Sequence, residues 1–239
     1  MWILGADSFT EVLIGAGVRL FIIFFILPIH EFAHAWAAYG LGDPTAKNVG
    51  RLSLNPIRHI DPVGAILIFL VNFGWAKPVP VNPINFNNQR RRQGGMAWVS
   101  FAGPLSNIIC AFLGTGIMRI LLSFSAIYTG ENGLYLLSGL NTFVSINCAL
   151  AIFNLLPVPP LDGSKILNWI LSDKWTYKLD RFLSQYSMIV TIVFLAMIFG
   201  GLFDGVIGFM SSVILNSSWF VFDFILNLLN LPTLVEIGW

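Results

Sequence analysis

Charged residues are scarce in this chain. Of its 239 residues, 10% are charged and 56% are apolar, whereas about a quarter of the residues in an ordinary soluble domain are charged. Almost all the charges lie outside a few long apolar stretches, as expected where lipid excludes unpaired charge. This scarcity argues against a soluble globule and indicates a membrane domain.

Cysteine is also rare, and Cys110 and Cys148 both fall within apolar stretches. We interpret them as small packing residues rather than as a disulfide or a metal-binding pair. Arg90, Arg91 and Arg92 form the only basic run, and in an apolar chain such a run marks membrane topology more often than a nucleic-acid surface. The N-terminus lacks the basic start and cleavage site of a signal peptide, so we expect the first apolar segment to be retained.

Several apolar stretches reach or approach the length of about 20 residues that a membrane-spanning helix needs. The three longest candidates are Val12–Ala38, Ala97–Leu122 and Tyr135–Leu156. Tyr186–Phe203 is shorter, and Val206–Leu231, which is interrupted by polar residues, is either a fifth span or an interfacial helix. We predict a polytopic bundle of four to five transmembrane helices in one membrane-embedded domain, residues 1–239, with a core over about 12–165 and C-terminal helices over about 183–231.

The segment between the first two spans has a different pattern. It is rich in proline pairs that are typical of turns and extended chain, namely Asn55-Pro56, Asp61-Pro62, Lys77-Pro78-Val79-Pro80 and Asn82-Pro83. Its apolar core, Val63–Phe73, is about half as long as a span. We therefore predict a small membrane-associated β-sheet or hairpin here, between the first and second transmembrane helices.

The basic residues predict the orientation of the bundle. Eleven of the thirteen Lys and Arg lie in Lys47–Arg92 and Lys165–Arg181, and the positive-inside rule places both segments on the cytoplasmic side. The first span then runs inward, the second outward and the third inward again. The C-terminal ends of the first and third spans therefore share the cytoplasmic face of a multi-pass membrane protein.

His30-Glu31-Phe32-Ala33-His34, near the end of the first span, has the pattern H-E-x-x-H. At 3.6 residues per turn both histidines lie on one helix face and can bind one tetrahedral Zn²⁺. Glu31 lies beside them, where it can take a proton from water rather than bind the metal. Three structural polar groups are the alternative, but burying them in lipid costs several kcal/mol, and a metal is the most direct compensation. Pro28 removes a backbone hydrogen bond to Phe24, so we expect a kink in the helix just before the motif that admits water.

A catalytic zinc usually has three protein ligands, so a third remains to be found. The candidates are Asp43, His59, Asp61, Glu131 and Asp162. Glu131 is excluded by depth, since it falls on the outer side in this topology. We favour Asp162, which follows the third span in a proline-rich stretch, with Gly163 allowing close backbone approach. His59 and Asp61 remain competitors, because their loop could fold back over the metal.

Asn154 lies about one turn inside the third span. Its amide could hydrogen-bond a substrate backbone or a developing oxyanion. An interhelical hydrogen bond is the alternative for this side chain.

Three motifs in this order resemble the site-2 proteases, a family of intramembrane zinc metalloproteases. They are His30–His34, Gly103-Pro104-Leu105-Ser106-Asn107 and Asn154–Gly163, and the resemblance covers about Phe21–Lys165. Since no hydrophilic stretch could hold a PDZ domain, the chain is similar to the compact branch. Leu155 stands where the family usually has proline after Asn154.

The resemblance implies one Zn²⁺ per chain, held by His30, His34 and Asp162, with Glu31 as general base. It implies a catalytic and substrate-binding role for Asn154, and we also assign Pro157 to substrate binding. The expected activity is hydrolysis of peptide bonds in transmembrane substrates near the cytoplasmic side of a bacterial or archaeal membrane, with the Gly50–Pro83 region offering a β-edge to the substrate.

Two other functions compete with proteolysis. A noncatalytic scaffold with a structural zinc would need no general base. A metal or proton transporter would also bury His, Glu and Asp, but we find no paired half-helices or repeat of the kind that transporters have.

Overall fold

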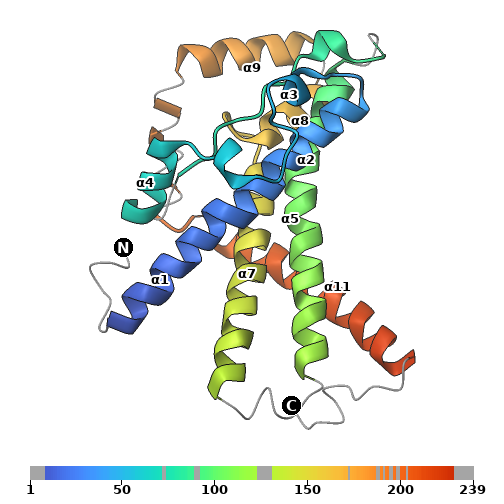
Figure 1. Ribbon diagram of the computed structural model, residues 1–239. Helices are drawn as coiled ribbons and strands as arrows, with labels where there is room; N and C mark the ends of the chain where they lie inside the picture. The colour runs from blue at the N-terminus through green and yellow to red at the C-terminus, as the bar shows by residue number, and fades with distance from the viewer. Residues whose placement is uncertain are drawn as a thin grey trace. The chain divides into compact units, whose positions relative to one another are not determined.

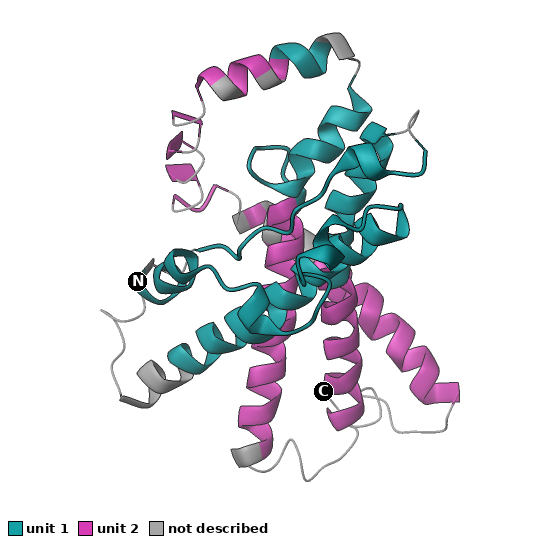
Figure 2. Cartoon of the chain, turned by 45° about the horizontal axis from the view of Figure 1, so that its top comes forward, with its two compact units in different colours: residues 1–106, 155–178 teal, residues 107–154, 179–239 magenta. Residues whose placement is uncertain are grey.

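The computed structural model describes residues 9–71, 74–88, 92–122, 131–171, 173–186 and 204–228, together with 189–190, 192–193, 196–197 and 200–202. The chain divides into two compact units, which Figure 2 distinguishes by colour. Unit 1 contains residues 1–106 and 155–178, and unit 2 contains residues 107–154 and 179–239.

Unit 1 begins with three helical segments that run directly into one another (Figure 1): α1 (Phe9–Phe21), the π-helical segment η1 (Ile22–Ile26) and α2 (Leu27–Gly40). The wider π-helical turn lies immediately before Pro28, which is in the first turn of α2. Proline has no N–H to donate back to the preceding turn, and π-helical bulges are one way in which a helix accommodates such a break. The helix type therefore changes just before the H-E-x-x-H motif, and the expected kink that admits water stays a prediction.

Three of the proline pairs between the first two spans start helical segments, whereas Lys77-Pro78-Val79-Pro80 does not. In each of these three pairs an Asn or Asp side chain caps the segment and the proline occupies the first helical position, a combination that favours a helix start. Asn55 caps η2 (Pro56–Arg58), Asp61 caps α4 (Pro62–Val71) and Asn82 caps η3 (Pro83–Asn85). A short helix, α3 (Thr45–Asn48), precedes them.

These caps explain why the predicted β-hairpin is not confirmed. The described part of the apolar core, up to Val71, is helix α4, because Asp61 accepts hydrogen bonds from the N–H groups of Val63 and Gly64 and so starts a helix. Residues 74–82 form neither helix nor strand, and no strand occurs in the ranges that the structure describes.

Three helical stretches are long and apolar enough to cross a membrane: Gly15–Gly40, Arg92–Leu122 and Gly133–Leu155. They match the three spans expected from the sequence. The second stretch is α5 (Arg92–Leu122), and the third lies within α7 (Glu131–Leu155). Two further helices follow, α8 (Asp162–Ile170) and α9 (Asp173–Gln185).

The count of four to five spans is not confirmed. Much of the predicted fourth span, Tyr186–Phe203, lies outside the described residues. The predicted fifth is helix α11 (Asp204–Leu228), whose described apolar part, Ser212–Leu228, is shorter than a full span.

In unit 2 the helices α5, α7 and α11 pack around small and apolar side chains. Ala111, Val144 and Cys148 form a buried cluster, against which Phe143, Ile214 and Leu215 pack. Cys148 is thus a packing residue, as predicted, and both cysteines are free thiols. Asn107 of the second motif donates a hydrogen bond to the Asn147 side chain across α5 and α7, in the manner of polar contacts between membrane helices.

Asp223, one of the polar residues of α11, has a partner on α5. Its Oδ1 accepts a hydrogen bond from Arg119 Nε at 2.5 Å and also pairs with Arg119 Nη2. The Arg119 guanidinium lies 5.3 Å from the Trp219 ring centre. The Arg119 side chain is fully buried, so its charge depends on these contacts.

We expect Asp223→Ala to destabilise unit 2 by roughly 3 kcal/mol, because it leaves the buried Arg119 charge without its carboxylate. The double variant Arg119→Met with Asp223→Leu should recover most of that loss, because it removes both charges together. Unfolding in mixed detergent micelles, followed by circular dichroism, measures the free energy of unfolding of both variants. Equal stability of Asp223→Ala and the wild type would contradict this reading of the pair.

Candidate metal centre

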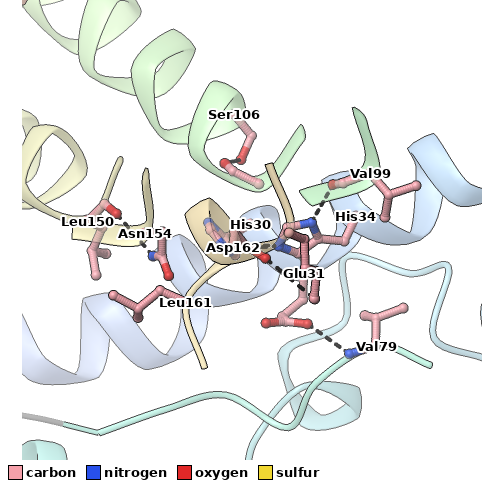
Figure 3. Close-up of polar contacts among 12 residues, drawn as sticks. His30, Glu31, His34, Val79, Val99, Ser106, Leu150, Asn154, Leu161 and Asp162 are labelled. Carbon is pink, nitrogen blue, oxygen red and sulfur yellow. Dashed lines mark hydrogen bonds and ion pairs between the residues drawn. The ribbon is translucent and has the colours of Figure 1, made fainter. Parts of the chain in front are cut away.

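Unit 1 brings together the two histidines of the H-E-x-x-H motif and Asp162. His30 and His34 lie one turn apart on α2, and their Nε2 atoms are 3.0 Å from each other. Asp162 Oδ2, at the start of α8, is 3.3 Å from His30 Nε2 and 3.2 Å from His34 Nε2. Figure 3 shows the three side chains pointing at one another. Their ligand atoms are close enough to hold one metal ion.

The spacing of these three atoms fits tetrahedral coordination. An ion with ligand bonds of about 2.0–2.1 Å holds neighbouring tetrahedral ligand atoms about 3.3–3.4 Å apart. The observed separations of 3.0, 3.2 and 3.3 Å approach that value. Two imidazoles and one carboxylate are also a donor set typical of catalytic zinc, which leaves a fourth position for water or substrate. The residues present therefore fit zinc.

The backbone of α5 fixes which nitrogen of His34 faces the centre. His34 Nδ1 lies 2.7 Å from the carbonyl oxygen of Val99. A carbonyl can only accept, so Nδ1 carries the proton and the Nε2 lone pair points at His30 and Asp162. Such a contact orients a ligating imidazole and raises its basicity.

Gly103 of the second motif leaves room for both imidazoles. A Cβ atom added at Gly103 would lie 2.6 Å from His30 Nε2 and closer still to His34 Nε2. Any side chain there would occupy the space in which the ligand atoms converge. This is the physical requirement for glycine at position 103.

Asp162 reaches the centre because α8 starts close to the end of α7. A Cβ at Gly163 would overlap the carbonyl oxygen of Leu155, so only glycine permits this approach, as predicted. Burial by itself would raise the pKa of Asp162, but its contacts with the imidazoles of His30 and His34 outweigh that effect and hold the pKa well below its usual value. The carboxylate is therefore ionised, as a metal ligand must be.

Glu31 lies beside the centre, but its carboxylate points toward the backbone of Val79. Its Oε2 accepts a hydrogen bond of 3.0 Å from the Val79 N–H (Figure 3). It is not part of the group formed by His30, His34 and Asp162. This agrees with the predicted division between two histidine ligands and a glutamate that does not bind the metal.

The rival third ligands are engaged elsewhere. Asp61 caps α4, and His59 Nε2 donates to the Ser53 carbonyl at 2.7 Å. Asp43 is buried and accepts hydrogen bonds from Thr45, Asn82 and Asn85. The side chain of Glu131 lies outside the described residues. Among the five candidates, Asp162 is the one that the structure brings to the histidines.

Asp43 instead joins the turn after α2 to η3, and this contact predicts a pH-dependent stability. Burial would raise the pKa of Asp43, but the hydrogen bonds from Thr45, Asn85 and Asn82 lower it below its usual value. Stability from a carboxylate with a lowered pKa is present above the unfolded-state pKa and is lost as the pH falls through the folded-state pKa. We expect Asp43→Asn to be less stable than the wild type by about 1–2 kcal/mol at pH 7. The difference in the free energy of unfolding between the wild type and Asp43→Asn should shrink below about pH 4. Unfolding of both proteins at a series of pH values measures this difference.

Asn154 and Pro157 carry the predicted substrate contacts. The Asn154 side-chain amide donates to the Leu150 carbonyl one turn earlier in α7, at 3.0 Å. Pro157 is exposed in the loop between α7 and α8. Their roles toward a substrate stay predictions.

Two contacts of the centre could not be predicted from the amino-acid sequence. The Val99 carbonyl and the Val79 N–H are backbone groups, so the identity of their residues does not reveal them. Gly103 could have been suspected from the sequence, since it opens the second motif. Its role depends on the close packing of α5 against the two histidines, which only the structure shows.

Known proteins that are similar to this chain are described as metalloproteases or peptidases. A family model described as peptidase family M50 matches residues 129–198. The chain is 44% identical to the "Putative zinc metalloprotease YwhC" of Bacillus subtilis over 170 residues, which are 69% of this chain and 74% of the relative. It is 29% identical to the "Putative zinc metalloprotease Rip2" of Mycobacterium tuberculosis over 215 residues, 86% of this chain and 78% of that protein.

A shorter match, 39% identical over 72 residues, is to the "Putative zinc metalloprotease MJ0611" of Methanocaldococcus jannaschii, and it covers 30% of this chain and 32% of the relative. No solved structure matches the chain. The length and identity of the match to YwhC, together with the M50 match, confirm the resemblance that the three motifs indicated. This chain belongs to peptidase family M50, the site-2 protease family.

Proposed function

We propose that this chain is an intramembrane zinc metalloprotease that hydrolyses peptide bonds in the transmembrane segments of other membrane proteins. The observation that carries this proposal is the convergence of His30, His34 and Asp162 within 3.3 Å of one another, with Glu31 beside them. Membership of a family of zinc metalloproteases and three apolar helices of spanning length support it.

His30, His34 and Asp162 would hold one Zn²⁺ per chain. Bound there, zinc supplies Lewis-acid chemistry, polarising the scissile carbonyl and making water a stronger acid. The protein's own contribution is to hold the three ligands in place. His34 is oriented by the Val99 carbonyl, and Asp162 is brought in by the close packing at Gly163.

Glu31 would act as the general base and then as the general acid. Its carboxylate takes a proton from the attacking water and later delivers one to the nitrogen of the leaving amine. The hydrogen bond from Val79 to Oε2 leaves Oε1 as the oxygen that can face water. This role separates the enzyme from a scaffold, since a structural zinc needs no base.

Asn154 would hydrogen-bond the substrate backbone or the oxyanion that develops during attack, and Pro157 would contact the substrate nearby. In the structure one N–H of the Asn154 amide donates to the Leu150 carbonyl, and the amide has a second N–H and an oxygen that could bind a substrate. The substrate helix must unwind locally before attack, because its own hydrogen bonds shield the peptide bond.

The positive-inside pattern supports an active site near the cytoplasmic side of a bacterial or archaeal cell membrane. We therefore expect the cut in a model transmembrane peptide to fall in its cytoplasmic half. Mass spectrometry of the products, after cleavage in vesicles of known orientation, locates the cut. A cut in the outer half would contradict the orientation without affecting the proposed chemistry.

Removal of the metal tests the proposed function directly. Purified protein in lipid vesicles is expected to contain one zinc per chain and to cleave a model transmembrane peptide. Treatment with 1,10-phenanthroline should remove zinc and cleavage together, and zinc sulfate should restore both. A folded chain that holds no zinc, or one that holds zinc and never cuts, would overturn the proposal.

A further inference from the structure

A buried arginine lies near the candidate centre and has no part in the mechanism above. Arg51 follows α3 in unit 1, and 6% of its surface is exposed. Its Nη2 atom donates to the carbonyl oxygens of Lys77 at 2.5 Å and Pro78 at 2.9 Å. Burial lowers the pKa of Arg51, and the charge of Glu31 partly offsets that effect by raising it. The two residues whose carbonyls Arg51 binds directly precede Val79, whose N–H is donated to Glu31 Oε2.

The segment that Arg51 holds is unusually poor in hydrogen-bond donors. In Pro78-Val79-Pro80 both prolines lack an N–H and have a fixed φ angle, so Val79 supplies the single N–H of the tripeptide. That N–H is donated to Glu31 Oε2. The tripeptide is therefore a stiff spacer with one donor, and the donor is used on the general base.

A further contact holds the residue just before the spacer. The Lys77 N–H is donated to the His59 carbonyl at 2.8 Å. Every N–H of residues 77–80 is thus either absent or already donated. These four residues offer no N–H to a substrate strand, so the β-augmentation expected of this region cannot use a donor from them. Their contacts serve the protein's own Glu31 instead.

We propose that Arg51 is a positioning residue for Glu31. By binding the carbonyls of Lys77 and Pro78, it fixes the Val79 N–H against Oε2 and so sets the direction in which the carboxylate presents its other oxygen. This role rests on the proposed function for its effect on catalysis. The contact itself, between a guanidinium, a backbone segment and a carboxylate, can be tested independently of turnover.

Arg51→Met removes the donors while keeping a long side chain. We expect kcat to fall about 10–100-fold, the size of effect typical of residues that orient groups at a metal site, with KM and zinc content unchanged. Arg51→Lys should restore part of kcat, because an ammonium keeps the charge but lacks the planar guanidinium geometry. Arg58→Met is the matched control, since Arg58 is an exposed arginine of the same segment, and it should leave kcat unchanged.

A second pair of variants tests the N–H of Val79, which is donated to Glu31. Val79→Pro deletes the donor, whereas Val79→Ala keeps it and removes only the side chain. We expect kcat to fall further in Val79→Pro than in Val79→Ala, and to about the level of Arg51→Met. The thermal midpoint of each variant shows whether it remains folded.

Amide hydrogen exchange gives a readout that does not need activity. Peptides covering residues 77–82 are informative, because the two prolines carry no exchangeable amide. In Arg51→Met this region should exchange at least about tenfold faster than in the wild type or in Arg58→Met. Unchanged exchange, or a folded Arg51→Met variant with wild-type kcat, would overturn the proposal. A wild type that never cleaves would refute the proposed function, while the exchange experiment would still decide the role of Arg51 in holding this segment.

Discussion

Glu31→Gln is expected to lower kcat for a model transmembrane peptide by roughly 10²–10⁴-fold, the usual contribution of a general acid or base. The glutamine side chain has almost the same shape, and its amide oxygen can still accept the Val79 N–H. What it cannot do is take a proton from water. Zinc content and the thermal midpoint should therefore stay at wild-type values.

Asp162→Asn serves as the contrasting variant, because Asp162 belongs to the ligand group and Glu31 does not. Asp162→Asn should lose zinc and activity together, and high zinc concentrations should restore part of both. Zinc content and peptide cleavage are measured on both purified variants. Together they distinguish the loss of a general base from the loss of a metal ligand. If Glu31→Gln lost its zinc, or cut the peptide as fast as the wild type, the separation of base and ligands would be wrong.

Gly103→Ala is expected to weaken zinc binding by at least about 10–100-fold, the range seen when groups that support a metal site are disturbed. Its methyl group would lie 2.6 Å from His30 Nε2 and nearer to His34 Nε2, so at least one imidazole must turn away. Alanine favours helix over glycine by up to about 1 kcal/mol. The loss of zinc should therefore not arise from unfolding of α5.

Gly17→Ala provides the matched control for that substitution. Gly17 lies in α1, and a Cβ added there meets no atom within 4 Å. The control should bind zinc as the wild type does. Competition with a chromophoric chelator measures the zinc affinity of all three proteins. Wild-type affinity in Gly103→Ala would mean that the imidazoles do not occupy the positions described here.

The two histidine ligands could be predicted because they lie on one helix. The spacing of four residues places His30 and His34 on the same face whatever the rest of the chain does. Their Nε2 atoms are indeed 3.0 Å apart. Asp162 was harder, since four other residues competed with it, and the choice depended on the assumed topology and on the family resemblance.

The region between the first two spans shows how proline pairs can mislead. The prediction of a β-hairpin treated each pair as a turn or an extended dipeptide. The structure instead has Asp61 capping a ten-residue helix, α4, with Pro62 as its first residue. The capping signal was present in the sequence, because Asp followed by Pro is also a helix start. An apolar run of that length does not distinguish strand from helix.

The sequence by itself determined the membrane class of this protein, its three long apolar helices, the pairing of His30 with His34 and the family to which it belongs. These features follow from composition and from the short-range geometry of a helix. Only the tertiary structure decided that Asp162 and not Asp43, His59 or Asp61 meets the histidines, and that Gly103 must lack a side chain. It also decided that Val79 donates to Glu31 and that Arg51 binds the carbonyls just before Val79. Those contacts join residues far apart in the chain, often through backbone atoms, and no local pattern of side chains encodes them.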